Sequence, residues 1–151
     1  MLEVGCGAGA AAESICARLT SGHLLAVDRS ATAVERTRTR NAACIAAGLL
    51  EVRRSELSAL EVAPATVDHV LAVNVNLFWT RDAQAELQML RTALAPQGTL
   101  LLVYEQPPQG RTRSAAVADR VRTGLLAAGF TQPTVLQGEV TTALRTGTTD
   151  P

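Results

Sequence analysis

Residues 1–9 read Met-Leu-Glu-Val-Gly-Cys-Gly-Ala-Gly, and this stretch decides the fold. Its first part, residues 2–4, has the apolar character of a buried strand. The three glycines from Gly5 to Gly9 then let the backbone turn sharply and come close to a ligand. A second apolar run follows further along the chain and ends on Asp28. A strand, a glycine turn, a helix and a second strand tipped with a carboxylate predict a half-site for the ribose of a nucleoside.

The composition is that of a globular protein with one domain. The chain has 151 residues, of which 47% are hydrophobic, so it is long enough to bury a core. No apolar run approaches the ~18 residues that a membrane helix requires, and no cleavable signal precedes the first strand. The formal net charge is zero and the pI is about 6.7, which argues against a nucleic acid or a membrane surface as partner.

The cysteines favour neither a metal site nor a set of disulfides. Cys6, Cys16 and Cys44 lack the spacing of metal ligands and, being three, cannot all pair with one another. We therefore interpret them as small buried thiols of a protein in the reducing cytoplasm, and we predict no metal.

Strand and helix signals alternate along almost the whole chain. Four helices are expected: one after the glycine turn to about Gly22, one running to Gly48, one with its inner stripe over 83–94, and one over 117–128. Strands are predicted at 2–4, 24–28, 49–53, 67–75, 99–104, 134–137 and 140–145.

This alternation predicts an α/β fold, a doubly wound, Rossmann-like and mostly parallel sheet of seven strands with helices on both faces. The last two strands form a hairpin that adds an antiparallel edge, and the strand at 99–104 is expected to be central. We expect one domain over residues 1–147 and a frayed tail over 148–151.

Short-range patterns predict where helices and turns begin. Ser30 or Thr32 is expected to cap the second helix, and Thr32 with Glu35 has the capping-box spacing. Thr80 is expected to cap the third helix. Residues 95–98 (Ala-Pro-Gln-Gly) fit a type I turn, and the longest irregular stretch is expected over 106–113.

Two classes of cofactor use a half-site of this kind. Gly5-x-Gly7-x-Gly9-Ala10 satisfies the dinucleotide fingerprint, because its last position tolerates alanine. Glu3 shifts the balance, since a carboxylate at the end of a buried strand needs a partner. Beside a pyrophosphate it would add repulsion, whereas beside an ammonium or sulfonium group it would be favourable.

Residues 3–9 resemble the first motif of the class I S-adenosylmethionine-dependent methyltransferases: an acidic residue, any residue, then Gly-x-Gly-x-Gly. Asp28 matches the family's acidic residue at the end of the second strand, which binds the ribose hydroxyls. Ser55-Glu56-Leu57 resembles the acidic segment beside adenine.

The resemblance continues through the middle of the chain. Residues 67–74 are similar to the family's fourth strand, and 94–100 (Leu-Ala-Pro-Gln-Gly-Thr-Leu) resemble its Leu-x-Pro-Gly-Gly turn into the fifth strand. Gln97 replaces a glycine there, so we expect a different type of turn with the same topology.

The resemblance implies S-adenosylmethionine as the cofactor and methyl transfer to a nucleophilic atom as the reaction. The neutral charge favours a small-molecule acceptor. The residues expected to bind the cofactor are Glu3, Gly5, Cys6, Gly7, Gly9, Asp28, Arg29, Glu56, Leu57 and Asn74.

Each expected role has a plainer alternative. Glu3 meets the cofactor's ammonium group or orients the loop, and both can hold. Asp28 accepts from both ribose hydroxyls or caps a helix, while Arg29 and Leu57 line adenine or simply pack. Glu56 accepts from the adenine amine or is solvated. The backbone carbonyl of Asn74 is expected to face the cofactor's amino group.

The acceptor is expected to contact residues near the ends of the fourth and fifth strands. Asn76, Trp79 and Tyr104 are the candidates, and a hydrophobic anchor is an equally open interpretation for Trp79. No catalytic residue is assigned. Tyr104 and Glu105 form the one plausible acid–base pair, with a structural role as the favoured alternative.

The sequence begins inside the first strand, whereas members of the family carry a helical segment before it. We therefore expect a small bacterial type that is short at its N-terminus, with an open crevice that a homodimer or a partner subunit could cover. The alternatives are a non-catalytic binding module or a truncated enzyme that needs a partner. An NAD(P)-dependent oxidoreductase is disfavoured, because the chain has no lysine for a Tyr-x-x-x-Lys pair.

Overall fold

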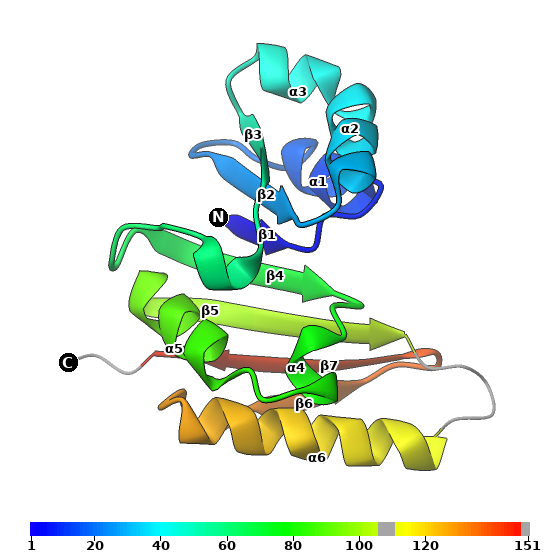
Figure 1. Cartoon of the computed structure of the whole chain (residues 1–151), viewed down its shortest axis with the longest axis vertical. Coiled ribbons are helices and arrows are strands. Elements are labelled where there is room, and N and C mark those ends of the chain that lie inside the picture. The colour runs from blue at the N-terminus through cyan, green and yellow to red at the C-terminus, as the bar shows by residue number, and fades with distance from the viewer. Residues whose placement is uncertain (106–110, 149–151) are drawn as a thin grey trace. The chain divides into compact units, whose positions relative to one another are not determined.

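The computed structural model describes residues 1–105 and 111–148, excluding the side chains of residues 111–114. Contacts divide the chain into two compact units, Met1–Glu61 and Val62–Pro151. Figure 1 labels the elements of both, and each unit is described by itself.

The first unit is a three-stranded parallel sheet with its helices. Its strands lie in the order β3-β2-β1, and the register places Leu2 opposite Leu25 and Leu24 opposite Leu50. The elements are β1 (Leu2–Val4), α1 (Ala10–Cys16), β2 (Leu24–Asp28), α2 (Ala31–Arg40), α3 (Ala42–Ala46), β3 (Leu50–Arg54) and the short 3₁₀ helix η1 (Leu57–Ala59).

An apolar cluster holds the helices of this unit to its sheet. Ala12 and Cys16 of α1 and Val34 of α2 pack with side chains of β2 and β3, and Cys44 and Ile45 of α3 lie against them. Removal of this apolar surface from water stabilises the unit. It also fixes α1 and α2 beside the loop that follows β1.

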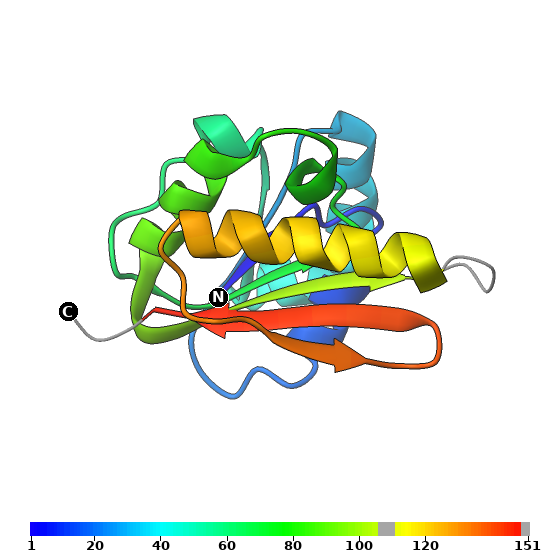
Figure 2. The same ribbon diagram turned by 90° about the horizontal axis from the view of Figure 1, so that it is seen from below.

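The second unit is a four-stranded mixed sheet in the order β4-β5-β7-β6. β4 and β5 are parallel, whereas β7 is antiparallel to both of its neighbours. Figure 2 shows α6 running along the β6–β7 hairpin. The elements are β4 (Val67–Val73), α4 (Leu77–Thr80), α5 (Gln84–Ala93), β5 (Leu94–Glu105), α6 (Arg111–Ala127), β6 (Thr134–Gln137) and β7 (Thr141–Gly147).

The predicted strands and their directions are confirmed, except that β5 begins at Leu94 and not at residue 99. The parallel strands, the hairpin and the position of β5 between β4 and β7 agree with the expected α/β class. The single domain over 1–147 stays a prediction. Of the predicted tail, Thr148 is held by a hydrogen bond from its hydroxyl to the carbonyl oxygen of Ala95, 3.1 Å, and residues 149–151 lie outside the described residues.

The second predicted helix begins and ends differently. Ser30 is its cap, because the Ser30 hydroxyl accepts a hydrogen bond from the Ala33 N–H at 3.3 Å. Thr32 already lies inside α2, so the predicted capping box with Glu35 is wrong. The helix also breaks at Asn41, whose φ of −109° separates α2 from α3. Helix α1 ends at Cys16, well before Gly22.

Thr80 ends a helix and caps none. Its hydroxyl donates to the carbonyl oxygen of Asn76 at 2.9 Å, which keeps it in the last turn of α4. Helix α5 begins at Gln84, whose N–H donates to the Asp82 carboxylate at 3.0 Å. Two short helices therefore replace the single helix that Thr80 was predicted to cap. The Thr80 hydroxyl bonds to the preceding turn, and the Asp82 carboxylate accepts from the first N–H of α5.

The turn predicted over 95–98 is not of type I and lies within β5. Gln97 has a φ of +61°, in the left-handed region that the third position of a type II turn requires. Gln97 therefore takes a conformation that glycine adopts without strain. The predicted irregular stretch over 106–113 is shorter, because α6 begins at Arg111; residues 106–110 lie outside the described residues.

Candidate functional site

The glycine loop after β1 needs all three of its glycines. Gly5, Gly7 and Gly9 have φ values of 72°, 55° and 78°, which L side chains rarely adopt. The loop is tied to β2, since the N–H groups of Gly5 and Cys6 both donate to the carbonyl oxygen of Val27. The loop then enters α1, with Gly9 as the cap residue.

Gly7 and Gly9 differ in what surrounds them. A Cβ on Gly7 would meet only the Gly5 carbonyl oxygen, at 4.0 Å, so the space above this residue is open. A Cβ on Gly9 would lie 2.7 Å from the Asn41 amide nitrogen and 2.9 Å from Thr37 Cα. Gly7 thus leaves room for a ligand to approach the backbone, whereas Gly9 lets α2 pack closely.

Two polar side chains of α2 hold the loop in place. The buried Thr37 hydroxyl lies 3.2 Å from the Gly7 carbonyl oxygen and 3.4 Å from the Cys6 sulfur, while Asn41 donates to the Gly9 carbonyl oxygen at 3.1 Å. Sequence reasoning missed both residues. Their signal was present, because they continue the buried stripe of Val34 with spacings of three and four residues.

The Asp28 carboxylate joins the loop to the start of α2. Its Oδ2 accepts from the Gly7 N–H at 3.0 Å and its Oδ1 from the Ser30 N–H at 2.8 Å. Ser30 is the cap of α2, so the alternative of Asp28 as that cap is wrong. A carboxylate offers about four acceptor sites, so both oxygens can still accept from a further pair of donors.

Glu3 is a buried acid without a counter-ion. Glu3 is only 2% exposed, and its Oε2 atom has no hydrogen-bond partner. Burial, and secondarily the negative charge of Asp28, raise the pKa of Glu3 to about 7. A cation bound beside these two acids would be attracted by both charges and would favour the ionised form of Glu3.

The other predicted residues of the first unit lie around the end of β3. Arg29 and Glu56 are exposed, and the Arg29 carbonyl oxygen accepts from the Arg54 guanidinium at 3.3 Å. Leu57 is 7% exposed at the start of η1. The Ser55 N–H donates to the Asp28 carbonyl oxygen, which keeps the segment leading to Glu56 next to β2.

Asn74, in the second unit, uses its side chain to fix two strand ends. Its Oδ1 accepts from the Glu105 N–H at 2.9 Å, and its N–H donates to the Val103 carbonyl oxygen. Its φ of 56° marks a sharp turn at the end of β4. The amide is therefore a clamp between β4 and β5, a role that sequence reasoning did not foresee.

Trp79 and Tyr104 are brought together within the second unit. Their rings meet edge to face, with centroids 4.4 Å apart and an interplanar angle of 86°. The Tyr104 hydroxyl is buried without a hydrogen-bond partner, and burial raises the pKa of this phenol. Tyr104 consequently remains protonated near neutral pH. Asn76 is exposed and caps α4, and its carbonyl oxygen accepts a hydrogen bond from the Trp79 N–H at 3.2 Å.

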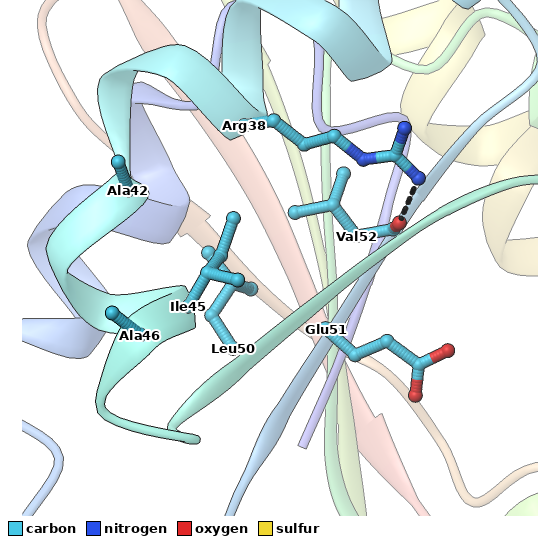
Figure 3. Close-up of a pocket in the computed structure, with 7 residues that line it drawn as sticks. All are labelled: Arg38, Ala42, Ile45, Ala46, Leu50, Glu51 and Val52. Atoms are coloured by element: carbon cyan, nitrogen blue, oxygen red, sulfur yellow. Dashed lines mark hydrogen bonds between the residues drawn. The ribbon is translucent and has the colours of Figure 1, made fainter.

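A cavity of about 560 Å³ lies elsewhere in the first unit, between α2, α3 and β3 (Figure 3). None of the predicted site residues lines it. Its lining residues are Arg38, Ala42, Ile45, Ala46, Leu50, Glu51 and Val52.

Two features are absent from residues 1–105 and 111–148. These residues contain no group of three or more His, Cys, Asp and Glu side chains that could hold a metal ion. No helix formed by them has the length and apolar character to cross a bilayer.

The comparison with family models identifies the family of this chain. Residues 2–100 match the family model described as a methyltransferase domain. Among curated proteins, none matches the sequence. An Aquifex aeolicus structure described as a SAM-dependent methyltransferase is 18% identical with a TM-score of 0.81, over 96% of this chain and 79% of that one.

Two further solved structures have the same fold. A SAM-dependent methyltransferase from Mesorhizobium loti is 15% identical with a TM-score of 0.71, over 96% of this chain and 89% of that one. A third structure is a Haloferax volcanii complex between a methyltransferase activator and a proposed methyltransferase. The matching chain of that complex is 14% identical with a TM-score of 0.75, over 99% of this chain and 82% of that one. These likenesses confirm the predicted doubly wound fold.

Proposed function

The chain belongs to the methyltransferase domain family, and from this membership we propose that it transfers a methyl group from S-adenosylmethionine to a nucleophilic atom of a small-molecule acceptor. The observation that carries the proposal is the loop after β1. There the open space above Gly7 adjoins a carboxylate, Asp28, that already binds the loop.

The residues of the first unit fit this cofactor. The open approach to Gly7 would let the amino-acid part of the ligand come close to the loop backbone. The remaining acceptor sites of Asp28 suit the two hydroxyls of a ribose, with charge-assisted bonds of about 1.5–3 kcal/mol each. The orphaned Oε2 of Glu3 suits an ammonium group, directly or through water. Exposed Glu56 is the proposed acceptor from the adenine amine, and Arg29 and Leu57 the proposed neighbours of its faces.

S-adenosylmethionine supplies an electrophilic methyl group on a positively charged sulfur. The protein's part is then to position the acceptor and to exclude water. We assign acceptor binding to Asn76, Trp79 and Tyr104 of the second unit, where the protonated Tyr104 hydroxyl can donate a hydrogen bond. The chain's neutral charge supports a small acceptor over a nucleic acid, and its free cysteines support a reducing compartment such as the cytoplasm.

Titration calorimetry with S-adenosylhomocysteine and, separately, NADH tests the cofactor assignment. We expect binding of the first alone, weakened about 10- to 100-fold by Asp28→Ala. Asp119→Ala is the matched control, because Asp119 is an exposed carboxylate of α6. Unchanged affinity in Asp28→Ala would remove the ribose assignment, and failure of the wild-type chain to bind either ligand would overturn the proposal.

A turnover assay separates an enzyme from a binding module. The chain is incubated with S-adenosylmethionine and a panel of small oxygen, nitrogen, carbon and sulfur nucleophiles, and release of S-adenosylhomocysteine is measured. Binding without turnover against any acceptor would favour a non-catalytic module or an enzyme that needs a partner subunit.

A further inference from the structure

The two sheet edges of this chain are protected to different degrees. A strand at an edge exposes unpaired N–H and C=O groups that invite another strand. At β3, the outermost strand of the first unit, the Arg38 guanidinium donates to the Val52 carbonyl oxygen at 2.9 Å (Figure 3). β3 also carries an exposed ion pair between Glu51 and Arg53. A covered carbonyl and surface charges discourage pairing at β3.

β6, the outermost strand of the second unit, has no such protection. Its four residues, Thr134–Gln137, include no charged residue and no proline, and all are exposed. Among the described residues four large hydrophobic side chains are exposed, and three of them belong to this hairpin: Val135 at 41%, Leu136 at 48% and Val140 at 57%. Figure 2 shows β6 (orange) along the outer side of the hairpin.

The hairpin register shows which backbone groups point outward. The Gly138 N–H donates to the Thr141 carbonyl oxygen at 2.8 Å, and Leu136 lies opposite Ala143. Because hydrogen-bonded pairs alternate along an antiparallel ladder, the backbone of Leu136 faces β7. The N–H and C=O of Val135 therefore point away from the sheet.

We infer that β6 pairs antiparallel with β6 of a second copy of this chain, joining two sheets across a two-fold axis. The donor and acceptor of Val135 make the strand complementary to itself, and no charge on β6 has to lose its water. Leu136 lies on the opposite face of the sheet from Val135, and the two Leu136 side chains are diagonal neighbours across the axis.

An antiparallel copy brings the turn of each chain towards the Thr134 end of the other. This inference is independent of the proposed function.

Sedimentation velocity over a range of concentrations tests the dimer. We expect the wild-type chain to change from 15.8 kDa to twice that mass as its concentration rises. Leu136→Lys places two like charges near the axis and should stay monomeric, with at least a tenfold weaker association. Glu51→Lys is the matched control, because it places a lysine on the other sheet edge and should dimerise like the wild type.

Hydrogen exchange of the wild-type chain gives a readout that needs no variant. The Val135 N–H should become protected as concentration rises, whereas the Leu136 N–H, which faces β7, should be protected at every concentration. A wild-type chain that stays monomeric at several hundred micromolar would overturn the inference. A dimer that persists in Leu136→Lys, or one that leaves the Val135 N–H unprotected, would also overturn it.

Discussion

Glu3→Gln tests whether a buried acid lowers the stability of the first unit at neutral pH. The pKa of Glu3 is raised from 4.5 to about 7, mainly by burial and then by Asp28. Between these two values the folded chain binds a proton that the unfolded chain has released. The free energy of unfolding therefore falls as pH rises through this window.

The size of the effect follows from the two pKa values. One unit of pKa is worth about 1.4 kcal/mol. The full shift therefore lowers the free energy of unfolding by about 3 kcal/mol above pH 7, but by less than 1 kcal/mol at pH 5. Glutamine has nearly the same shape as protonated glutamate and does not titrate. The stability of Glu3→Gln relative to the wild type should therefore rise by about 2–3 kcal/mol between pH 5 and pH 8.

Urea unfolding at several pH values, without ligand, measures this difference. Glu35→Gln is the control, because it makes the same substitution at an exposed carboxylate of α2. Parallel profiles for the wild type and Glu3→Gln from pH 5 to pH 8 would refute the reasoning, since they would mean that Glu3 titrates alike in the folded and unfolded chain.

Four further outcomes are expected. Affinity for S-adenosylhomocysteine, measured by calorimetry, should increase from pH 6 to pH 8 as Glu3 ionises, and Glu3→Gln should remove the increase. Gly9→Ala should lower the free energy of unfolding by more than 2 kcal/mol, as measured with urea, because its Cβ would lie 2.7 Å from the Asn41 amide in addition to straining φ. Ala65→Gly should raise the melting temperature, with a gain of about 0.5–1 kcal/mol, because Ala65 has a φ of 56°. Asn74→Ala should cost about 2 kcal/mol in urea unfolding, since it loses the bond to the Glu105 N–H and places alanine in a left-handed conformation.

The sequence predicted the strands well because their apolar runs are short and bounded by glycine, proline or charge. The position of Asp28 at the end of β2 followed from the same pattern. Helix boundaries were predicted less well, because several residues compete for the same N–H groups. Ser30 and Thr32 both suit a cap, and the choice depends on Asp28 holding the Ser30 N–H. Thr80 was wrongly predicted to be a cap, because a threonine hydroxyl can also donate to a carbonyl oxygen of the preceding turn.

Spacing can show that a residue is buried, as it does for Asn41, but it cannot show which distant residue that side chain contacts. The clamp of Asn74 on Glu105 joins residues 31 positions apart, and the bond from Asn41 to Gly9 joins residues 32 apart. Neither pair stands out in one sequence. The edge-to-face contact of Trp79 with Tyr104 is of the same kind.

The geometry of the glycine loop explains why its motif could nonetheless be recognised in the sequence. Asp28 does more than offer acceptors to a ligand, because its Oδ2 also accepts a hydrogen bond from the Gly7 N–H. One carboxylate therefore shapes the loop and presents acceptors beside it, so the protein needs the acid whether or not a ligand is bound. Glu3 differs, because its Oε2 atom is buried without a hydrogen-bond partner. A positively charged ligand bound beside Glu3 would favour its ionised form and so offset the loss of stability that ionisation brings.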